Sequence, residues 1–197
     1  MNETTPNIDP HHTMLLAMDY QAAVVGSIPE PDGLLARVAV AIATARGRGV
    51  QIGYVRVAFG DADHAAVPET NKAFAGAAAS RRFRDDAPET AIHEAVAPKP
   101  GDLVVRKTRV GAFSTTDLHR QLRARGVDTL ILAGIATSGV VLSTVRDAAD
   151  RDYRLYVLED GCCDRDPAVH ELLMEKVFPR QGYVVSIVDL PDLLTPE

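Results

Sequence analysis

Short apolar runs rich in β-branched residues alternate along this chain with longer stretches in which apolar residues recur every three or four positions. The short runs predict strands and the longer stretches predict helices. This alternation predicts βαβ units, which build a parallel sheet covered by helices on both faces. We therefore expect an α/β fold of three α-β-α layers around six mostly parallel strands. The predicted strands are 14–18, 51–57, 103–107, 129–133, 153–158 and 183–188, and the predicted helices are 34–45, 118–126, 140–150 and 166–177.

Polar residues mark three of the predicted helix starts. Asp32 precedes the first helix and is a candidate cap. Ser114 and Asp117 have the spacing of a capping box, and Asp166 is followed by Pro167 at the first helical position.

The length of 197 residues fits a single domain, which we place at residues 13–190 after an N-terminal tail of residues 1–12. The stretch 58–101 is the least regular part, with four prolines and an alanine-rich piece. A long connection in a compact domain is often an active-site lid. The alternative is a solvated excursion with a short surface helix.

The charge balance argues against nucleic acid as a partner, and the lack of long apolar runs argues against a membrane. The chain has 21 lysines and arginines against 27 acidic residues, whereas nucleic-acid binding requires a basic face. It has no apolar run of the ~20 residues that span a membrane and no signal-peptide core. We therefore expect a cytoplasmic protein that acts on a small molecule and binds neither nucleic acid nor membrane.

Several chemically useful residues follow predicted strands directly. Asp19 comes after the first strand, and Lys107 ends the third. A small-residue loop at 134–140 joins the fourth strand to a helix, and the loop at 161–164 follows the fifth strand. In parallel α/β sheets, ligands bind at the carboxyl ends of the strands. A carboxylate there can act as general acid or base, and a lysine beside it can orient it or stabilise negative charge. The helix start in the loop presents amide groups suited to an anion.

The order of these segments resembles the isochorismatase-like hydrolase superfamily, which includes nicotinamidases, other cysteine hydrolases and isochorismatases. The resemblance runs from about residue 14 to residue 188. The segments that carry it are Asp19, Lys-Thr-Arg-Val-Gly-Ala-Phe-Ser at 107–114, Ala-Gly-Ile-Ala-Thr-Ser at 133–138 and Ser-Thr-Val-Arg-Asp-Ala-Ala at 143–149.

The resemblance implies a site as well as a fold. Amidases of the family use an Asp-Lys-Cys triad, in which Asp19 and Lys107 match the first two members. It also implies a cis peptide between Ile135 and Ala136, an oxyanion hole formed by the amides of Ala136 and Val140, and a homo-oligomer, either dimer or tetramer. The further residues expected to contact substrate are Thr137, Phe113 and Arg109.

The sequence departs from the family pattern at Val140, which stands where the family has its nucleophilic cysteine. Valine cannot form an acyl-enzyme. Ser138 lies two residues early for this role. Cys162 and Cys163 follow a neighbouring strand, and such adjacent thiols more often pack as small apolar groups.

Some family members lack the cysteine and still cleave the vinyl ether of isochorismate, a reaction placed in siderophore and phenazine pathways. The resemblance implies that Asp19 would protonate the enolpyruvyl carbon while Lys107 positions it and binds a substrate carboxylate. Arginine also binds carboxylates well. The candidate arginines are Arg56, Arg81, Arg82, Arg84 and Arg109.

Nicotinamidases of the family carry an Asp-x-His-x-His metal cluster, and the nearest match here is Asp61, Asp63 and His64, without a second histidine nearby. We expect His93, His119 and His170 to be surface groups. Since the loop at 134–140 also lacks the dinucleotide pattern G-x-G-x-x-G, we expect neither a catalytic metal nor a cofactor.

Three functions stay open at this point. The leading one is a cysteine-free hydrolase of isochorismate or another small anionic enol ether. The second is an amide or ester hydrolase that uses water activated by Asp19, or a thiol of Cys162 or Cys163. The third is a binding or scaffold protein that has kept the fold without catalysis.

Overall fold

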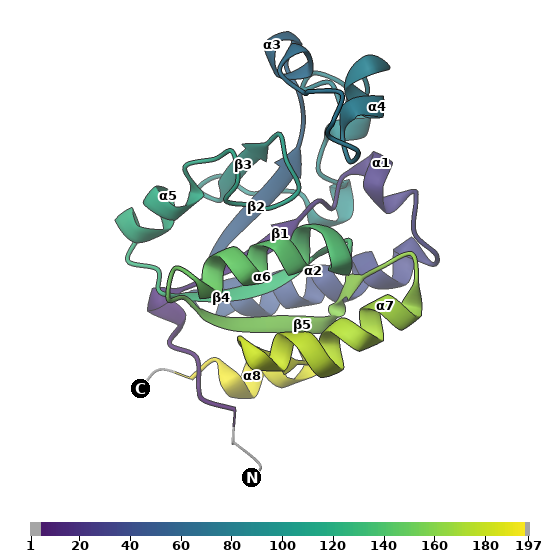
Figure 1. The fold of residues 1–197 in the computed structure, drawn as a ribbon. Coiled ribbons are helices and arrows are strands. Elements are labelled where there is room, and N and C mark those ends of the chain that lie inside the picture. Colours follow the sequence, from purple (N-terminus) through teal and green to yellow (C-terminus); the bar gives the residue numbers. More distant parts are fainter. Residues whose placement is uncertain (1–4, 196–197) are drawn as a thin grey trace.

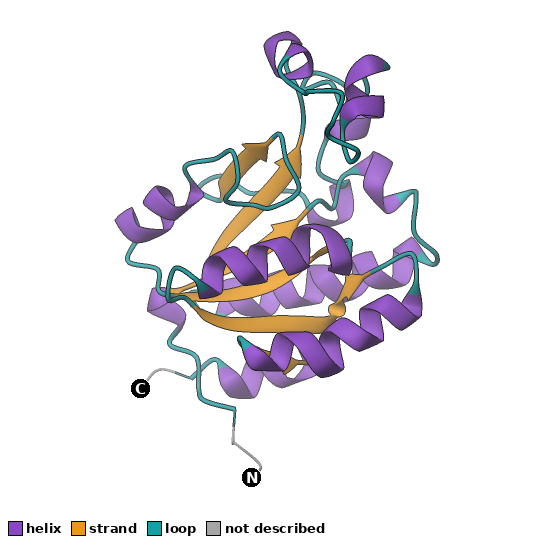
Figure 2. Cartoon of the chain, viewed as in Figure 1, coloured by secondary structure: helices purple, strands orange, loops and turns teal. Residues whose placement is uncertain are grey.

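Six strands form one sheet in the order β3-β2-β1-β4-β5-β6, and every pairing in it is parallel. The computed structural model describes residues 5–195, and helices cover both faces of the sheet (Figures 1 and 2). The predicted fold class is therefore confirmed. The strands are β1 (Thr13–Met18), β2 (Gln51–Val57), β3 (Leu103–Lys107), β4 (Thr129–Ile135), β5 (Arg154–Cys163) and β6 (Tyr183–Val185). The helices are α1 (Ala22–Val25), α2 (Pro31–Gly47), α3 (Asp61–Ala65), α4 (Ala75–Ala79), α5 (Leu118–Ala124), α6 (Leu142–Ala149), α7 (Pro167–Leu172) and α8 (Leu190–Leu193).

The central strands β1 and β4 are buried along their whole length, because helices pack on both of their faces. Edge strand β3 instead alternates buried and exposed residues. Met18 at the end of β1 pairs with Val55 of β2 and with Gly134 of β4. Asp19 therefore emerges in the middle of the carboxyl edge of the sheet, between the ends of β2 and β4.

Two apolar clusters hold the layers together. On one face the cluster includes residues of α2 and α8, such as Leu34, Val38 and Leu190. On the other face it includes residues of α5 and α6, such as Leu118 and Val145, and of the π-helical turn that follows α7. No helix among residues 5–195 is long and apolar enough to cross a membrane.

Several element boundaries differ from the sequence prediction. Helix α2 begins at Pro31, so Asp32 lies in its first turn rather than before it. The predicted capping box was wrong, because α5 begins at Leu118 and the Ser114 amide donates to the Gly111 carbonyl. The cap at Asp166 is confirmed, since its side chain accepts from the Ala168 amide. Strand β5 runs to Cys163, beyond its predicted end at residue 158. Its pairing with β4 is interrupted after Val157 by a register shift and continues at Cys162 and Cys163.

The irregular stretch 58–101 forms α3, α4 and short 3₁₀ turns that project beyond the carboxyl end of β2 (Figure 1). Ion pairs attach it to the sheet edge: Asp85 contacts both Arg56 and Arg106, and Arg106 also lies 2.5 Å from Asp63. Its role as a lid stays a prediction.

The N-terminal segment packs on the domain from residue 5 onward. Ile8 is fully buried, and its amide donates to the Leu193 carbonyl over 2.8 Å. The Tyr156 hydroxyl donates to the Pro6 carbonyl over 2.9 Å. These contacts join the chain before β1 to α8 and β5.

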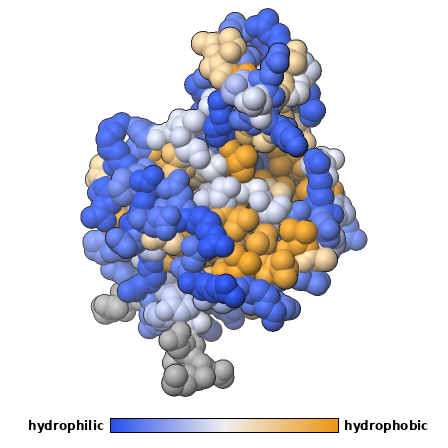
Figure 3. All heavy atoms as spheres, viewed as in Figure 1, coloured by the Kyte–Doolittle hydropathy of each residue, from blue (hydrophilic) through white to orange (hydrophobic). Residues whose placement is uncertain are grey.

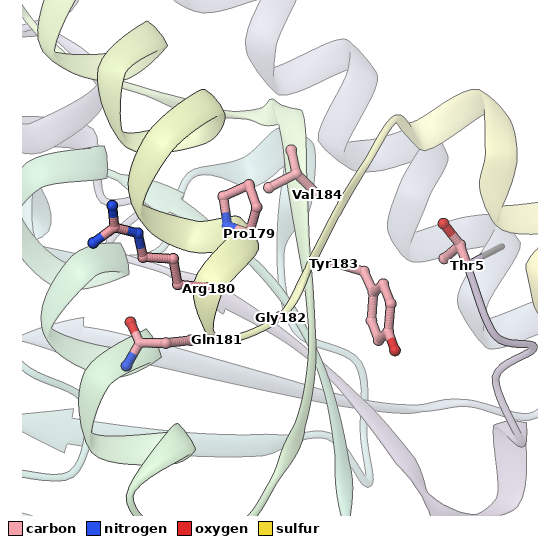
Figure 4. A pocket seen from close by; sticks show the side chains of 7 residues that line it. All are labelled: Thr5, Pro179, Arg180, Gln181, Gly182, Tyr183 and Val184. Atoms are coloured by element: carbon pink, nitrogen blue, oxygen red, sulfur yellow. The ribbon is translucent and has the colours of Figure 1, made fainter. Parts of the chain in front are cut away.

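The surface in Figure 3 is mostly hydrophilic, with an apolar area at the lower right, over α6 and α7. Leu172 of α7 is 58% exposed. A separate hollow of about 430 Å³ lies beside edge strand β6 (Figure 4). In this view Arg180 and Gln181 lie on one side of the chain, and Tyr183 and Thr5 lie on the other. Its lining has no carboxylate, cysteine or histidine.

Candidate active site

Asp19 and Lys107 meet at the carboxyl edge of the sheet, whereas the sequence predicted only that each stands at the end of a strand. The Lys107 Nζ atom donates to Asp19 Oδ2 over 2.7 Å and to the Val110 carbonyl over 2.7 Å. Both side chains are more than nine-tenths buried. Asp19 has a φ of 60°, in the left-handed region, and its amide donates to the Val55 carbonyl. The chain therefore turns away from β1 at Asp19, at the carboxyl edge of the sheet.

Burial and Lys107 act on the pKa of the Asp19 carboxyl group in opposite directions. Burial raises the pKa of Asp19 above its ordinary value, and the charge and hydrogen bond of Lys107 oppose that rise. Lys107 occupies Oδ2, whereas Oδ1 is buried and has no hydrogen-bond partner among residues 5–195. An unpaired buried carboxylate oxygen is costly, so this atom is the natural contact point for a substrate or a water molecule.

The loop after β4 begins beside Asp19. The Ile135–Ala136 peptide bond is cis, as the family resemblance implies. Gly134 sits so close to Met18 that an added Cβ would lie 3.0 Å from the Met18 carbonyl oxygen, so a larger residue would push the two strand ends apart. Residues Thr137–Val141 then form a π-helical turn that leads into α6. Val140 lies in this turn and is buried.

Contacts from the segment 107–113 join this turn to the Lys107 side of the site. Val110, whose carbonyl binds Lys107, has its Cγ1 3.9 Å from the Cβ position of Gly139. The Ala112 amide donates to the buried hydroxyl of Thr144 on α6 over 3.2 Å. The acid, the lysine and the predicted oxyanion loop are therefore neighbours in one site.

The structure does not bring Phe113 to this site. Its ring stacks on Tyr153, with 6.1 Å between centroids, and the Arg151 guanidinium lies 5.2 Å from its centroid. Tyr153 directly precedes β5, so these contacts are at the amino end of the sheet, opposite Asp19. Phe113 thus packs in the core, because α6 covers it and the loop that carries it turns away from Lys107.

Arg109 is the candidate arginine nearest to Lys107 in the sequence. It lies two residues after Lys107, is half-buried, and donates to the neighbouring Thr108 carbonyl. No carboxylate lies within ion-pair distance of it in the described part of the chain. The others are engaged elsewhere: Arg56, Arg81 and Arg84 pair with Asp85, Asp61 and Asp86, and Arg82 lies over the Phe83 ring.

The two cysteines lie on β5 and are free thiols. Cys162 pairs with Gly134, is buried in the core, and burial raises its pKa to about 12. Burial also raises the pKa of the partly exposed Cys163, which packs against the cluster beneath α2. Thiolate is the nucleophilic form, so both environments disfavour attack.

Three residues beside the site make contacts that the sequence did not indicate. The buried Gln21 amide binds the Val57 amide and carbonyl and the Thr90 carbonyl, which ties the stretch 58–101 to β2. Asp164 accepts from the Ser138 amide over 2.7 Å, and His170 lies 2.9 Å from the Thr137 hydroxyl. The local signals were the position of Gln21, two residues after Asp19, and the position of Asp164 in the loop after the fifth predicted strand.

The histidines differ from expectation in burial. His93, His119 and His170 were all expected at the surface, and all three are half-buried. His119 bonds to the Tyr153 hydroxyl and His170 to the Thr137 hydroxyl. Within residues 5–195, no three His, Cys, Asp or Glu side chains are grouped as a metal site would require. Asp61 and Asp63 pair with arginines, and the His64 ring stacks on Phe59.

Comparison with known proteins places this site in a family. The family model for the isochorismatase domain matches residues 13–189. The uncharacterized isochorismatase family protein YwoC of Bacillus subtilis is 32% identical over 90% of this chain and 92% of its own length. The ureidoacrylate amidohydrolase RutB of Methylobacterium radiotolerans is 29% identical (91% and 78% covered), and the phenazine biosynthesis protein PhzD1 of Pseudomonas aeruginosa is 30% identical (91% and 85%).

A solved structure agrees with these sequence relationships. An isochorismatase family protein from Burkholderia thailandensis superposes with a TM-score of 0.81 at 27% identity, covering 97% of this chain and 99% of that one. The chain belongs to the isochorismatase family of hydrolases.

Proposed function

We propose that this protein hydrolyses a small anionic enol ether, such as isochorismate, without a cysteine nucleophile. Asp19 is the general acid, Lys107 positions it, and no covalent intermediate forms. The observation that carries the proposal is the buried Asp19 carboxyl group, which has one oxygen held by Lys107 and the other without a partner among the described residues.

The chemistry of Asp19 suits proton donation to carbon. Because burial raises its pKa, a larger fraction of the carboxyl group is protonated near neutral pH than for an exposed aspartate. The proton on Asp19 moves to the vinylic methylene carbon of the substrate, which leaves an oxocarbenium-like centre. Water adds to that centre and returns a proton to Asp19. The resulting hemiketal collapses, and pyruvate and the ring alcohol separate.

Val140 supports a route without a covalent step. Its buried isopropyl group occupies the turn where the family resemblance puts the thiol, so no nucleophile is available there. The side chain also narrows the space beside the loop. We propose that the Ala136 and Val140 amides and Arg109 bind the substrate anion rather than an acyl oxyanion.

The second candidate is amide hydrolysis by water that the Asp19 carboxylate activates. The similarity to a ureidoacrylate amidohydrolase favours it. In this route Asp19 acts as a base, and the Ala136 and Val140 amides stabilise the oxyanion.

The test is an assay of pyruvate release from isochorismate by the wild type, Asp19→Ala and Val140→Cys. We expect release by the wild type and its loss in Asp19→Ala. If the wild type releases no pyruvate and Val140→Cys gains amide hydrolysis, isochorismate is not the substrate, and the other two members of the amidase triad are still in place. Binding of isochorismate without turnover by any variant would favour the non-catalytic alternative.

Two further features stay predictions. The stretch 58–101 acts as a lid in this proposal, since its ion pairs hold it beside the carboxyl edge of the sheet. We also expect a homo-oligomer, which sedimentation equilibrium would test.

A further inference from the structure

The turn that carries Thr137 and Val140 lacks a cap of its own. The residue before it is Ala136, whose methyl group cannot accept a hydrogen bond. The first amides of a helical turn need acceptors from elsewhere when they are not in water. Partners from a distant part of the chain therefore decide how this turn is held.

Both partners come from the segment that follows β5. Asp164 accepts from the Ser138 amide over 2.7 Å and is itself largely buried. Burial raises the pKa of Asp164. Hydrogen bonds from the backbone of Ser138, Asp166 and Arg165 lower it by more, so the pKa of Asp164 lies below its ordinary value. A carboxylate that stays ionised at a helix start is favourable, because the exposed amides there carry partial positive charge.

The second contact is between His170 of α7 and Thr137. The Thr137 hydroxyl is fully buried, and His170 Nδ1 lies 2.9 Å from its oxygen. Burial lowers the pKa of His170, and the facing carboxylates of Asp164, Glu159 and Glu171 oppose that shift. The ring is therefore mainly neutral at pH 7, when one nitrogen can accept and the other can donate.

These contacts lie on the opposite side of the turn from Lys107. The strand order places β5 on one side of β4, and β1, β2 and β3 on the other. Gly139 of the turn faces Val110, which binds Lys107, whereas Thr137 and Ser138 face the segment after β5. The turn is thus held between the reacting groups on one side and Asp164 and His170 on the other; we call these two residues the polar clamp.

We infer that Asp164 and His170 are positioning residues, which hold the amides and side chains of residues 136–140 in register with Asp19 and Lys107. This inference rests on the proposed function for its consequence in catalysis, but the clamp itself is independent of the substrate. Neither residue contacts the reacting groups; both act through Thr137 and Ser138.

The test compares Asp164→Ala and His170→Ala with conservative variants and matched controls by amide hydrogen exchange and turnover. Asp164→Asn and His170→Asn each keep a hydrogen-bonding group near the original position. The control His119→Ala removes a histidine bonded to the Tyr153 hydroxyl at the far end of the sheet. The control Asp160→Ala removes a carboxylate that binds the Ile187 amide.

We expect exchange in a peptide covering 134–142 to accelerate about tenfold in both alanine variants, with little change in β1 and β2 peptides. The asparagine variants should stay near wild type, and the controls should leave this peptide unchanged. In turnover, the alanine variants should lose about tenfold in kcat with KM within about twofold.

Unchanged exchange at 134–142 would overturn the inference, and so would equal acceleration in every peptide, which signals general destabilisation. A peptide that loosens while kcat stays at the wild-type value would overturn the positioning role. If the wild type releases no pyruvate, the proposed function fails, while the exchange comparison still decides whether the clamp exists.

Discussion

Lys107 Nζ lies 2.7 Å from Asp19 Oδ2 although β2 separates the two strands that carry these residues. The lysine reaches across the end of β2, and its side chain is buried. A buried pair of this kind is sensitive to the loss of either member, because the remaining charge is left without compensation. This sensitivity makes the pair accessible to stability measurements as well as to kinetics.

Lys107→Met should lower the free energy of unfolding by about 3 kcal/mol at pH 7, because it leaves a buried carboxylate unpaired. The folded-state pKa of Asp19 is already raised and rises further without the lysine. A raised carboxyl pKa favours folding below the unfolded-state pKa and loses that contribution as pH rises through the folded-state value. In urea titrations, the loss of unfolding free energy caused by Lys107→Met should therefore be smaller at pH 5 than at pH 7. Lys176→Met, at an exposed pair with Glu175, is the control and should change stability little. An equal deficit at both pH values would contradict this account.

Gln21→Leu should destabilise the protein by about 2–4 kcal/mol, because it leaves the Val57 amide and the Val57 and Thr90 carbonyls without their buried partner. Limited proteolysis should also cut more readily within 58–101. Gln51→Leu is the matched control, since its side chain makes one exposed contact with the Arg125 carbonyl. Similar losses in both variants would show that Gln21 has no special tie to this stretch.

Arg109→Ala should raise KM for an anionic substrate about tenfold, because a bidentate arginine–carboxylate contact is lost, while kcat changes less. Arg81→Ala is the control, since Arg81 is exposed and already paired with Asp61. Steady-state kinetics of the two variants checks this prediction, and an unchanged KM in Arg109→Ala removes this arginine from the substrate site.

Cys162→Ala and Cys163→Ser should leave turnover within about threefold of wild type, because neither thiol has the environment of a nucleophile. Cys162 should also resist iodoacetamide at pH 8, since it is buried and its pKa is about 12. Mass spectrometry after alkylation and kinetics of each variant would check this. Complete loss of activity in Cys163→Ser alone would restore the thiol route.

The sequence predicted those parts of the site that follow directly from local pattern. Asp19 and Lys107 stand at strand ends, and parallel strands bring their carboxyl ends to one edge. The loop at 134–140 was predicted for the same reason. These positions depend only on the strands being parallel, and the alternation of strands and helices is sufficient to indicate that.

The parts that were missed depend on contacts between distant segments. Phe113 lies near Lys107 in sequence, yet the turn at 110–112 directs it to Tyr153, a partner 40 residues away. Asp164 and His170 reach the loop from the segment after β5. The sequence placed the loop at 161–164 just after a predicted strand, but it did not indicate that Asp164 binds Ser138 or that His170 binds Thr137. Side-chain hydrogen bonds at such separations require the packed structure, because the helix period of 166–177 does not reveal which face meets Thr137.

The central claim is that Asp19 acts as an acid, and the pH dependence of kcat for pyruvate release from isochorismate tests it most directly. An acid must be protonated to act, and burial raises the pKa of Asp19. The account predicts that kcat is highest at low pH and falls as pH rises through that raised value, with this limb absent in Asp19→Asn. A kcat that rises with pH through the same range would show that Asp19 acts as a base and would contradict the account.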